Sequence, residues 1–556
     1  MKNLLGQIFL RSRYPLAAGA GLLLAAAFPN PGIAGFAWIA PALLLASAYG
    51  KNGVEAFRIG YVGGLAHFLF SLGWLLRIPA TGFPILGWLA LSAFLALYPA
   101  IWVWLLSGKV GQGSWLRRLT WTLLGGAVWV AWEMTQARLL SGFPWNFLGA
   151  SQFQLVPLIQ IASVTGVYGV SFVVVWFSLT ILSATLAILR QPNVRYIWMG
   201  DLLLPLVVVL CLFMSGNSRL RSLRDDDRPT LSVTFIQPSI PQTMIWNPAD
   251  NERRFGELLR LTTDALTNES ELVLWPEAAV PKMIRYHEET LRTITGLAKS
   301  NGVWLIVGSD DAEPARNVNG SKKAEYFNAS FLISPQGELV SRYCKRQLVA
   351  FGEYVPLARW LPFVKWLTPI DAGFVPGERV VPFELERRAS APGDSMEAKE
   401  RTELEFRAPI HTATLICFED VFPHLVRDYV NEDTDFLVNL TNDGWFGEGS
   451  EQWQHAASAV FRAVENGVPL LRCCNNGVTC WIDSRGVIRQ VFRDATGGVH
   501  GAGVMTAQIP LLTPGEKRQP TFYNRNGDWF GWGCVVLTVL VLLPRLTIHK
   551  REHPMG

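Results

Sequence analysis

Two patterns of hydrophobic residues divide the chain. From about residue 14 to residue 215, long apolar runs are separated by short polar loops, whereas residues 217–525 mix apolar and polar positions as an ordinary globular domain does. A helix needs roughly 20 apolar residues to cross about 30 Å of hydrocarbon. Eight runs come close to this length, and we predict a bundle of eight transmembrane helices from them: 14–29, 33–50, 55–76, 83–106, 119–136, 163–189, 197–215 and 528–546.

The charges in the short loops predict the orientation of these helices. Lys and Arg residues precede the first run and follow the second, fourth, sixth and eighth, while FPNPG and RIPATGFP carry almost none. The positive-inside rule therefore places both termini in the cytoplasm and the globular region outside. We predict a seven-helix transmembrane domain over 1–216, an outer domain over 217–525, and a final transmembrane helix with a cytoplasmic tail over 526–556. The net charge of +4 agrees with a basic inner rim and does not indicate nucleic-acid binding.

The outer region alternates segments typical of strands and helices. Such alternation predicts mixed α/β sheets covered by helices. Predicted strands are 231–237, 271–277, 303–309, 327–334, 412–419, 435–443, 470–476 and 477–484, and predicted helices are 248–266, 287–301 and 454–467. Residues 334–343 are expected to contain a turn between the strand before it and a further strand. The polar stretch 385–405 is expected to be an insertion or a mobile loop.

Polar residues suited to catalysis follow three of the predicted strands. They are Glu277, Cys417 and Lys345, the last with Glu353 eight residues later. Each alone has an ordinary explanation, as a solvated strand end, a small buried hydrophobe or a surface lysine. Together they are suited to a reaction with a cysteine nucleophile. A thiol with a pKa near 8.5 is only partly ionised at neutral pH, and a desolvated carboxylate can act as the base that removes its proton. A lysine can then stabilise the thiolate and an oxyanion.

The cysteines and histidines do not indicate a metal site. No pair of cysteines stands at a zinc-type spacing from a histidine, and we expect neither a metal nor a cofactor. The seven cysteines are an odd number, so at least one must be unpaired. The adjacent Cys473 and Cys474 are expected to be packing residues on a strand.

These motifs resemble a known superfamily. Glu277 in WPEAAVP, Lys345 in YCKRQLVAFGEYVP and Cys417 in ICFED are similar to the Glu–Lys–Cys triad of nitrilase-fold carbon–nitrogen hydrolases. Considered with the apolar runs, the chain most resembles the bacterial apolipoprotein N-acyltransferase family. That resemblance also rests on LAAAFPNPGIAGFAWIAPALL, SGFPWNFLGASQ, QTMIWN, NLTNDGWFG and QHAASAVFRAVENGVPLLRCCNNGVT.

The resemblance implies a fold, a location and a reaction. An αββα sandwich would face the periplasm from a multi-pass protein of the bacterial inner membrane, expected to be a monomer. Cys417 would take an acyl chain from the sn-1 position of a phospholipid as a thioester. The α-amino group of the S-diacylglyceryl-cysteine of an apolipoprotein would then accept it in a ping-pong mechanism, the last step of lipoprotein maturation.

The resemblance also implies roles for single residues. Glu277 would be the general base and Lys345 the oxyanion stabiliser, with Glu353 orienting Lys345. The resemblance also places Phe418 and Glu419 beside the nucleophile and Trp246 at the position of a mobile-arm tryptophan. Apart from the resemblance, Trp145 in GFPWNFLG is expected to be a supporting residue that acts as an interfacial anchor.

Two other functions remain open on the sequence. A membrane-tethered amidase or nitrilase would use the same three residues, with water as the acceptor and a small nitrogen compound as the substrate. A transporter or receptor whose outer domain only binds would keep its function after Cys417→Ala. The predicted spans lack charges at mid-membrane, which argues against transport.

Overall fold

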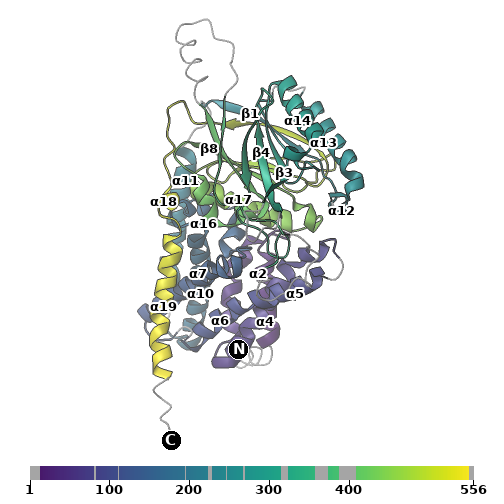
Figure 1. Cartoon of the computed structure of the whole chain (residues 1–556). Helices are drawn as coiled ribbons and strands as arrows, with labels where there is room; N and C mark the ends of the chain where they lie inside the picture. Colours follow the sequence, from purple (N-terminus) through teal and green to yellow (C-terminus); the bar gives the residue numbers. More distant parts are fainter. Residues whose placement is uncertain are drawn as a thin grey trace.

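A group of helices carries two stacked β-sheets at one end (Figure 1). The computed structural model describes residues 13–80, 83–109, 112–194, 196–222, 228–245, 247–266, 270–314, 324–356, 373–386 and 409–549. The predicted insertion at 385–405 lies outside these residues from 387 onwards.

The helical part contains nearly all of the chain before the sheets and one helix after them. Helix α19 (Trp529–His549) leads away from the sheets and packs along α7 (Figure 1). The other helices are α2 (Arg13–Ala26), α3 (Ala40–Ser47), α4 (Gly53–Ser71), α5 (Phe83–Leu95), α6 (Leu97–Leu106), α7 (Trp115–Gln136), α8 (Val156–Ile159), α9 (Ala162–Thr165), α10 (Val167–Arg190) and α11 (Met199–Ser222).

The prediction of eight membrane spans is not confirmed. Among the described residues, three helical stretches are long and apolar enough to cross a membrane: Pro84–Leu106, Val167–Arg190 and Met199–Arg221. The run at 33–50 does not form one helix, because the 3₁₀ helix η1 (Ala34–Trp38) is followed by the eight-residue α3. Eight residues of α-helix extend only about 12 Å, less than half of a bilayer core.

Two six-stranded sheets form the globular region. The first has the order β12-β1-β2-β3-β4-β5 and the second β11-β10-β9-β8-β7-β6. In each, three adjacent central strands are parallel and the others are antiparallel. The strands are β1 (Thr230–Gln237), β2 (Leu272–Leu274), β3 (Trp304–Pro314), β4 (Ala324–Ile333), β5 (Leu339–Cys344), β6 (Pro382–Leu385), β7 (Ile410–Ile416), β8 (Thr434–Thr441), β9 (Leu470–Cys474), β10 (Cys480–Ile482), β11 (Ile488–Val491) and β12 (Gly503–Pro510).

Helices cover the outer face of each sheet, as the predicted αββα sandwich requires. The amphipathic helices α13 (Asn251–Ala265) and α14 (Glu288–Asn301) bury Leu258 and Ile294 in a core against the first sheet. Helix α17 (Glu451–Asn466) lies between the second sheet and the helical part (Figure 1). The predicted strands and helices of this region are confirmed, whereas β6, β11 and β12 were not predicted.

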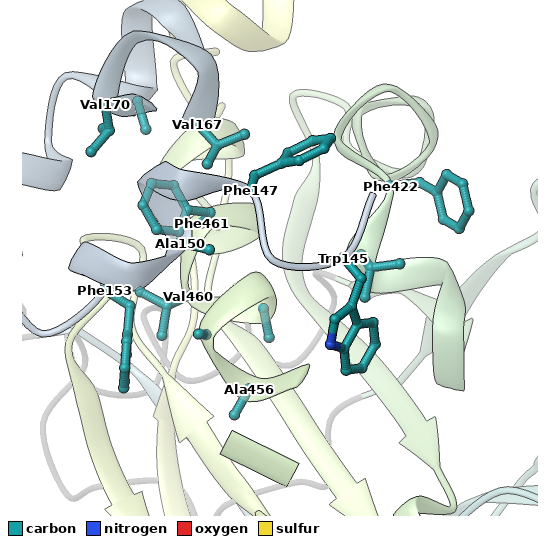
Figure 2. Packing of buried hydrophobic residues seen from close by; sticks show 14 of the residues in the cluster. Trp145, Phe147, Ala150, Phe153, Val167, Val170, Phe422, Ala456, Val460 and Phe461 are labelled. Carbon is teal, nitrogen blue, oxygen red and sulfur yellow. The ribbon is translucent and has the colours of Figure 1, made fainter. Parts of the chain in front are cut away.

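The sandwich and the helical part share one hydrophobic core. Phe147 and Phe153 of the helical part lie in the same cluster as Val460 and Phe461 of α17 (Figure 2). The same cluster continues between the two sheets. The helical part is therefore packed against the sandwich as the elements of a domain interior are packed against each other.

Candidate active site

The three predicted catalytic residues come from the carboxyl ends of three strands. Glu277 follows β2, Lys345 follows β5, and Cys417 begins the 3₁₀ helix η9 (Cys417–Val421) at the end of β7. The first two strands belong to one sheet and the third to the other. The stacking of the sheets brings the three residues together, because their strand ends meet at one edge of the sandwich.

Lys345 lies between two carboxylates. Its Nζ is 3.2 Å from Oε1 of Glu277 and 2.8 Å from Oε1 of Glu353. The Lys345 side chain is only 1% exposed. Burial lowers its pKa, but the charges of Glu277 and Glu353 outweigh that effect, so the pKa of Lys345 is raised well above its usual value. The lysine is thus held as a cation in a site that excludes water.

Asn328 on β4 holds Glu277 and Glu353 in place beside Lys345, and it is not among the residues predicted from the sequence. Its Nδ2 donates to Oε1 of Glu277 at 2.7 Å and to Oε1 of Glu353 at 2.9 Å. Its backbone carbonyl oxygen accepts from the backbone N–H of Lys345 at 2.9 Å. A buried amide in the apolar run FNASFLIS was the signal available in the sequence, since buried polar side chains require partners.

Cys417 has an unusual backbone conformation. Its φ of 51° lies in the left-handed region, which non-glycine residues seldom adopt and which costs about 1–2 kcal/mol. The carbonyl oxygen accepts from Nδ2 of Asn439 at 3.1 Å. Burial raises the pKa of the Cys417 thiol, the charge of Glu277 raises it further, and Lys345 opposes both. The thiol therefore needs a base in order to ionise.

Glu419 connects the Cys417 turn to the Lys345 loop. The fully buried carboxylate accepts from the backbone N–H of Ile416 at 2.7 Å and of Arg346 at 2.7 Å, and from the hydroxyl of Tyr343 at 2.7 Å. Burial raises the pKa of Glu419 and these hydrogen bonds oppose the rise. Its contacts fix the position of the two catalytic loops relative to each other.

Phe418 and Trp145 form an aromatic wall beside the nucleophile. Their ring centroids are 6.3 Å apart, and Phe143 is 6.0 Å from Phe418. Trp145 is buried, at 3% exposure, so its contacts are with other parts of the protein, and its role as an interfacial anchor stays a prediction. Its ring packs on Trp74 and its Nε1 donates to Gln454 at 2.8 Å, so it lies at the junction with the sandwich (Figure 2). The predicted arm residue Trp246 lies outside the described residues.

A network of buried charges lies behind the Cys417 turn. His455 of α17 is 2.8 Å from Asp420 and 2.9 Å from Asp443, and Arg472 contacts both carboxylates. Burial lowers the pKa of His455, but Asp420 and Asp443 raise it to about 10 overall. Asp443, His455 and Glu451 stand close enough for a metal ion, yet an imidazolium and a guanidinium already neutralise these carboxylates.

Cys473 and Cys474 are packing residues, as predicted. Both are fully buried on β9, and the Sγ of Cys473 donates to the carbonyl oxygens of Ile236 and Leu274 in the facing sheet. All seven cysteines are free thiols.

Comparisons with known proteins agree on one family. The family model for carbon-nitrogen hydrolases matches residues 232–519, and that for the apolipoprotein N-acyltransferase N-terminal domain matches residues 20–180. The apolipoprotein N-acyltransferase of Geobacter metallireducens is 36% identical over 96% of this chain and 95% of its own length. That of Vibrio vulnificus is 30% identical over 95% of this chain and 96% of its own.

A solved structure is similar to part of the chain. An amidase of the nitrilase superfamily from Nesterenkonia covers 50% of this chain and 90% of its own at 18% identity, with a TM-score of 0.35.

Proposed function

Because the chain belongs to the apolipoprotein N-acyltransferase family, we propose that it transfers an acyl chain from the sn-1 position of a phospholipid, through a thioester on Cys417, to the α-amino group of the S-diacylglyceryl-cysteine of an apolipoprotein. The observation that carries this proposal is the cluster of Glu277, Lys345 and Cys417 at one edge of the sandwich, next to the aromatic wall of Phe418 and Trp145.

The first half-reaction forms the thioester. Glu277 takes the proton from the Cys417 Sγ, and the thiolate attacks the ester carbonyl carbon. Lys345 and the backbone N–H of Phe418 stabilise the oxyanion, as fixed donors do in acyl transfer. The bond from carbon to the sn-1 oxygen then breaks, and Glu277 returns its proton to that oxygen as the lysophospholipid leaves.

The second half-reaction regenerates the enzyme. The neutral α-amino group of the acceptor attacks the thioester carbon, and the same donors hold the oxyanion. The carbon–sulfur bond breaks, one amine proton passes to Glu277, and Glu277 returns it to the sulfur. Glu353 and Asn328 keep Lys345 and Glu277 in place through both steps.

A membrane location follows from the substrates of this reaction. We propose that residues 1–216 and 526–556 lie in the bacterial inner membrane with both termini cytoplasmic, and that residues 217–525 face the periplasm. The three long apolar helices among the described residues support the membrane location, and the loop charges support this orientation. Both lipid substrates could then reach Cys417 from the outer leaflet.

The test is formation of an acyl adduct on Cys417. We expect purified protein in detergent, given phosphatidylethanolamine alone, to gain the mass of one acyl chain. Cys417→Ala should gain none, and Glu277→Gln should react at least 100-fold more slowly because it lacks the base. Addition of a diacylglyceryl-cysteine peptide should remove the adduct and acylate the peptide.

Two outcomes would contradict the proposal. An undiminished adduct on Cys417→Ala would exclude this thiol as the nucleophile. Release of free fatty acid in place of acylated peptide, or hydrolysis of small amides without any lipid, would favour the membrane-tethered amidase.

A further inference from the structure

One buried glutamine joins the sandwich to several segments of the helical part. Gln454 of α17 is 5% exposed. Among the described residues, its side chain makes five hydrogen bonds, all to the helical part. Its Oε1 accepts from Nε1 of Trp145 at 2.8 Å, Nε1 of Trp74 at 3.2 Å and Nδ2 of Asn146 at 3.3 Å, and its Nε2 donates to the carbonyl oxygens of Pro29 at 2.8 Å and Ser71 at 3.3 Å.

The segment that Gln454 holds is the one that reaches the nucleophile. Trp145 packs on Phe418, the residue after Cys417. From the other side, Nε2 of Gln136 donates to the carbonyl oxygens of Phe143 at 2.9 Å and Trp145 at 3.2 Å. The aromatic wall is therefore clamped between one glutamine of the helical part and one of the sandwich.

The next residue of α17, His455, contacts the segment that carries the nucleophile. His455 contacts Asp420, three residues after Cys417, and its ring is 5.5 Å from that of Trp145. Adjacent side chains of one helix thus hold the aromatic wall and the nucleophile turn. Gln454 reaches the wall through its hydrogen bond with Trp145, whereas the hydrogen bonds of Glu277, Lys345 and Glu353 join the reacting groups.

We propose that Gln454 is a positioning residue for the long-chain acyl donor: by fixing Trp145 against Phe418, it sets the apolar wall along which the chain lies as the ester reaches Cys417. This inference rests on the proposed thioester route. It predicts that the glutamine controls the reaction with a lipid donor and has little effect on the intrinsic reactivity of the thiol.

The test compares two acyl donors with Gln454→Leu, which keeps the size of the side chain but makes none of the five hydrogen bonds. We expect kcat/KM for Cys417 acylation by phosphatidylethanolamine to fall at least tenfold, mainly through KM. Acylation by the small soluble ester p-nitrophenyl acetate should stay within about twofold of wild type, because a two-carbon acyl group is too short to extend along the wall and depend on the position of Trp145. Reaction with the ester also reports that the variant is folded.

Gln160→Leu is the matched control. Gln160 is also a buried glutamine of the junction, but it donates to the carbonyl oxygens of Arg485 and Val156, at 2.8 and 2.9 Å. We expect it to react with both donors as wild type does. Equal losses in the two variants, or an equal loss of both donors in Gln454→Leu, would overturn the inference while leaving the thioester route intact. Failure of wild type to react with phosphatidylethanolamine would instead contradict the proposed function.

For a second variant, Gln454→Glu, we expect the lipid activity relative to wild type to depend on pH, which a general loss of packing would not cause. A neutral carboxyl group can accept from Trp145 and donate to Pro29 or Ser71, whereas an ionised one would place a charge against two carbonyl oxygens. We expect its lipid activity, divided by that of wild type at the same pH, to rise at least threefold from pH 8 to pH 6. A ratio that does not change with pH would contradict the role assigned to Gln454.

Discussion

At the scale of single residues, the site concentrates negative charge around one lysine. Besides Glu277 and Glu353, the partly buried Asp310 lies on β3, directly across from Asn328. Burial raises the pKa of Asp310 from 3.8 to about 7, and the charges of Glu277 and Glu353 add to the rise. Lys345 already neutralises its two neighbours, so the third carboxyl group is most stable when it is protonated.

Asp310→Asn should therefore change how stability depends on pH. Between pH 4 and 7 the folded protein holds this proton and the unfolded chain does not, so the contribution to stability is fully present below pH 4 and is lost progressively as pH rises to 7. We expect the stability gain of the variant over wild type to be larger at pH 8 than at pH 5, by on the order of 2–3 kcal/mol, because about two of the three pKa units of the shift lie between these pH values.

Thermal unfolding in detergent at the two pH values measures this difference. Asp264→Asn, at a solvent-exposed position of α13, is the control and should not alter the pH dependence. A gain of the same size at pH 5 and pH 8 would show that Asp310 does not titrate in this range.

At the scale of elements, the general base depends on how closely two strands approach. Glu277 follows β2 and lies against β3, where Val280 N–H donates to the Gly308 carbonyl oxygen at 3.1 Å. A Cβ on Gly308 would stand 2.2 Å from the Pro276 oxygen and 2.8 Å from Cα of Glu277. The absence of a side chain at this position of β3 thus allows Glu277 to reach Lys345.

Gly308→Ala should displace Glu277 and slow acylation of Cys417 at least tenfold, because a small misplacement of a catalytic group has a large effect on rate. The adduct assay measures the rate, and circular dichroism shows whether the sheet is kept. Gly296→Ala on α14 is the control, since a Cβ there meets nothing within 4 Å. Unchanged acylation in Gly308→Ala would mean that the Glu277 loop adapts without cost.

At the scale of the whole molecule, the sandwich and the helices form one cooperative body. Phe461 of α17 is fully buried near Phe147 and Phe153 of the helical part (Figure 2). The same cluster also contains residues on the inner faces of both sheets. A core shared in this way couples the unfolding of the two parts, because neither keeps its apolar surface covered alone.

Phe461→Ala should therefore destabilise both parts together. We expect a loss of about 3–5 kcal/mol from the lost apolar contacts and the cavity. Calorimetry should show a single transition that moves to lower temperature. Val340→Ala, at an exposed position of β5, should change stability by less than about 0.5 kcal/mol. Two separate transitions, of which one is unaffected by Phe461→Ala, would contradict a shared core.

The sequence by itself determined the features that depend on local pattern and residue type. Strand periodicity located β1, β7 and β8, and the polar residues that end the apolar strands pointed to Glu277, Lys345 and Cys417. The strands could be predicted because a buried strand is built from apolar residues. The three polar residues could be predicted because ligand sites of α/β sheets gather at the carboxyl ends of strands. The motifs around them also indicated the family.

The tertiary structure alone decided which distant residues meet. Glu277 and Lys345 are 68 positions apart in the chain, and their contact depends on the order of strands in one sheet. The buried site of Trp145, the bridge that Asn328 makes and the junction at Gln454 depend likewise on packing between segments far apart in sequence. The local pattern of apolar and polar residues does not predict such contacts, because they form only when distant segments are brought together by the fold of the whole chain.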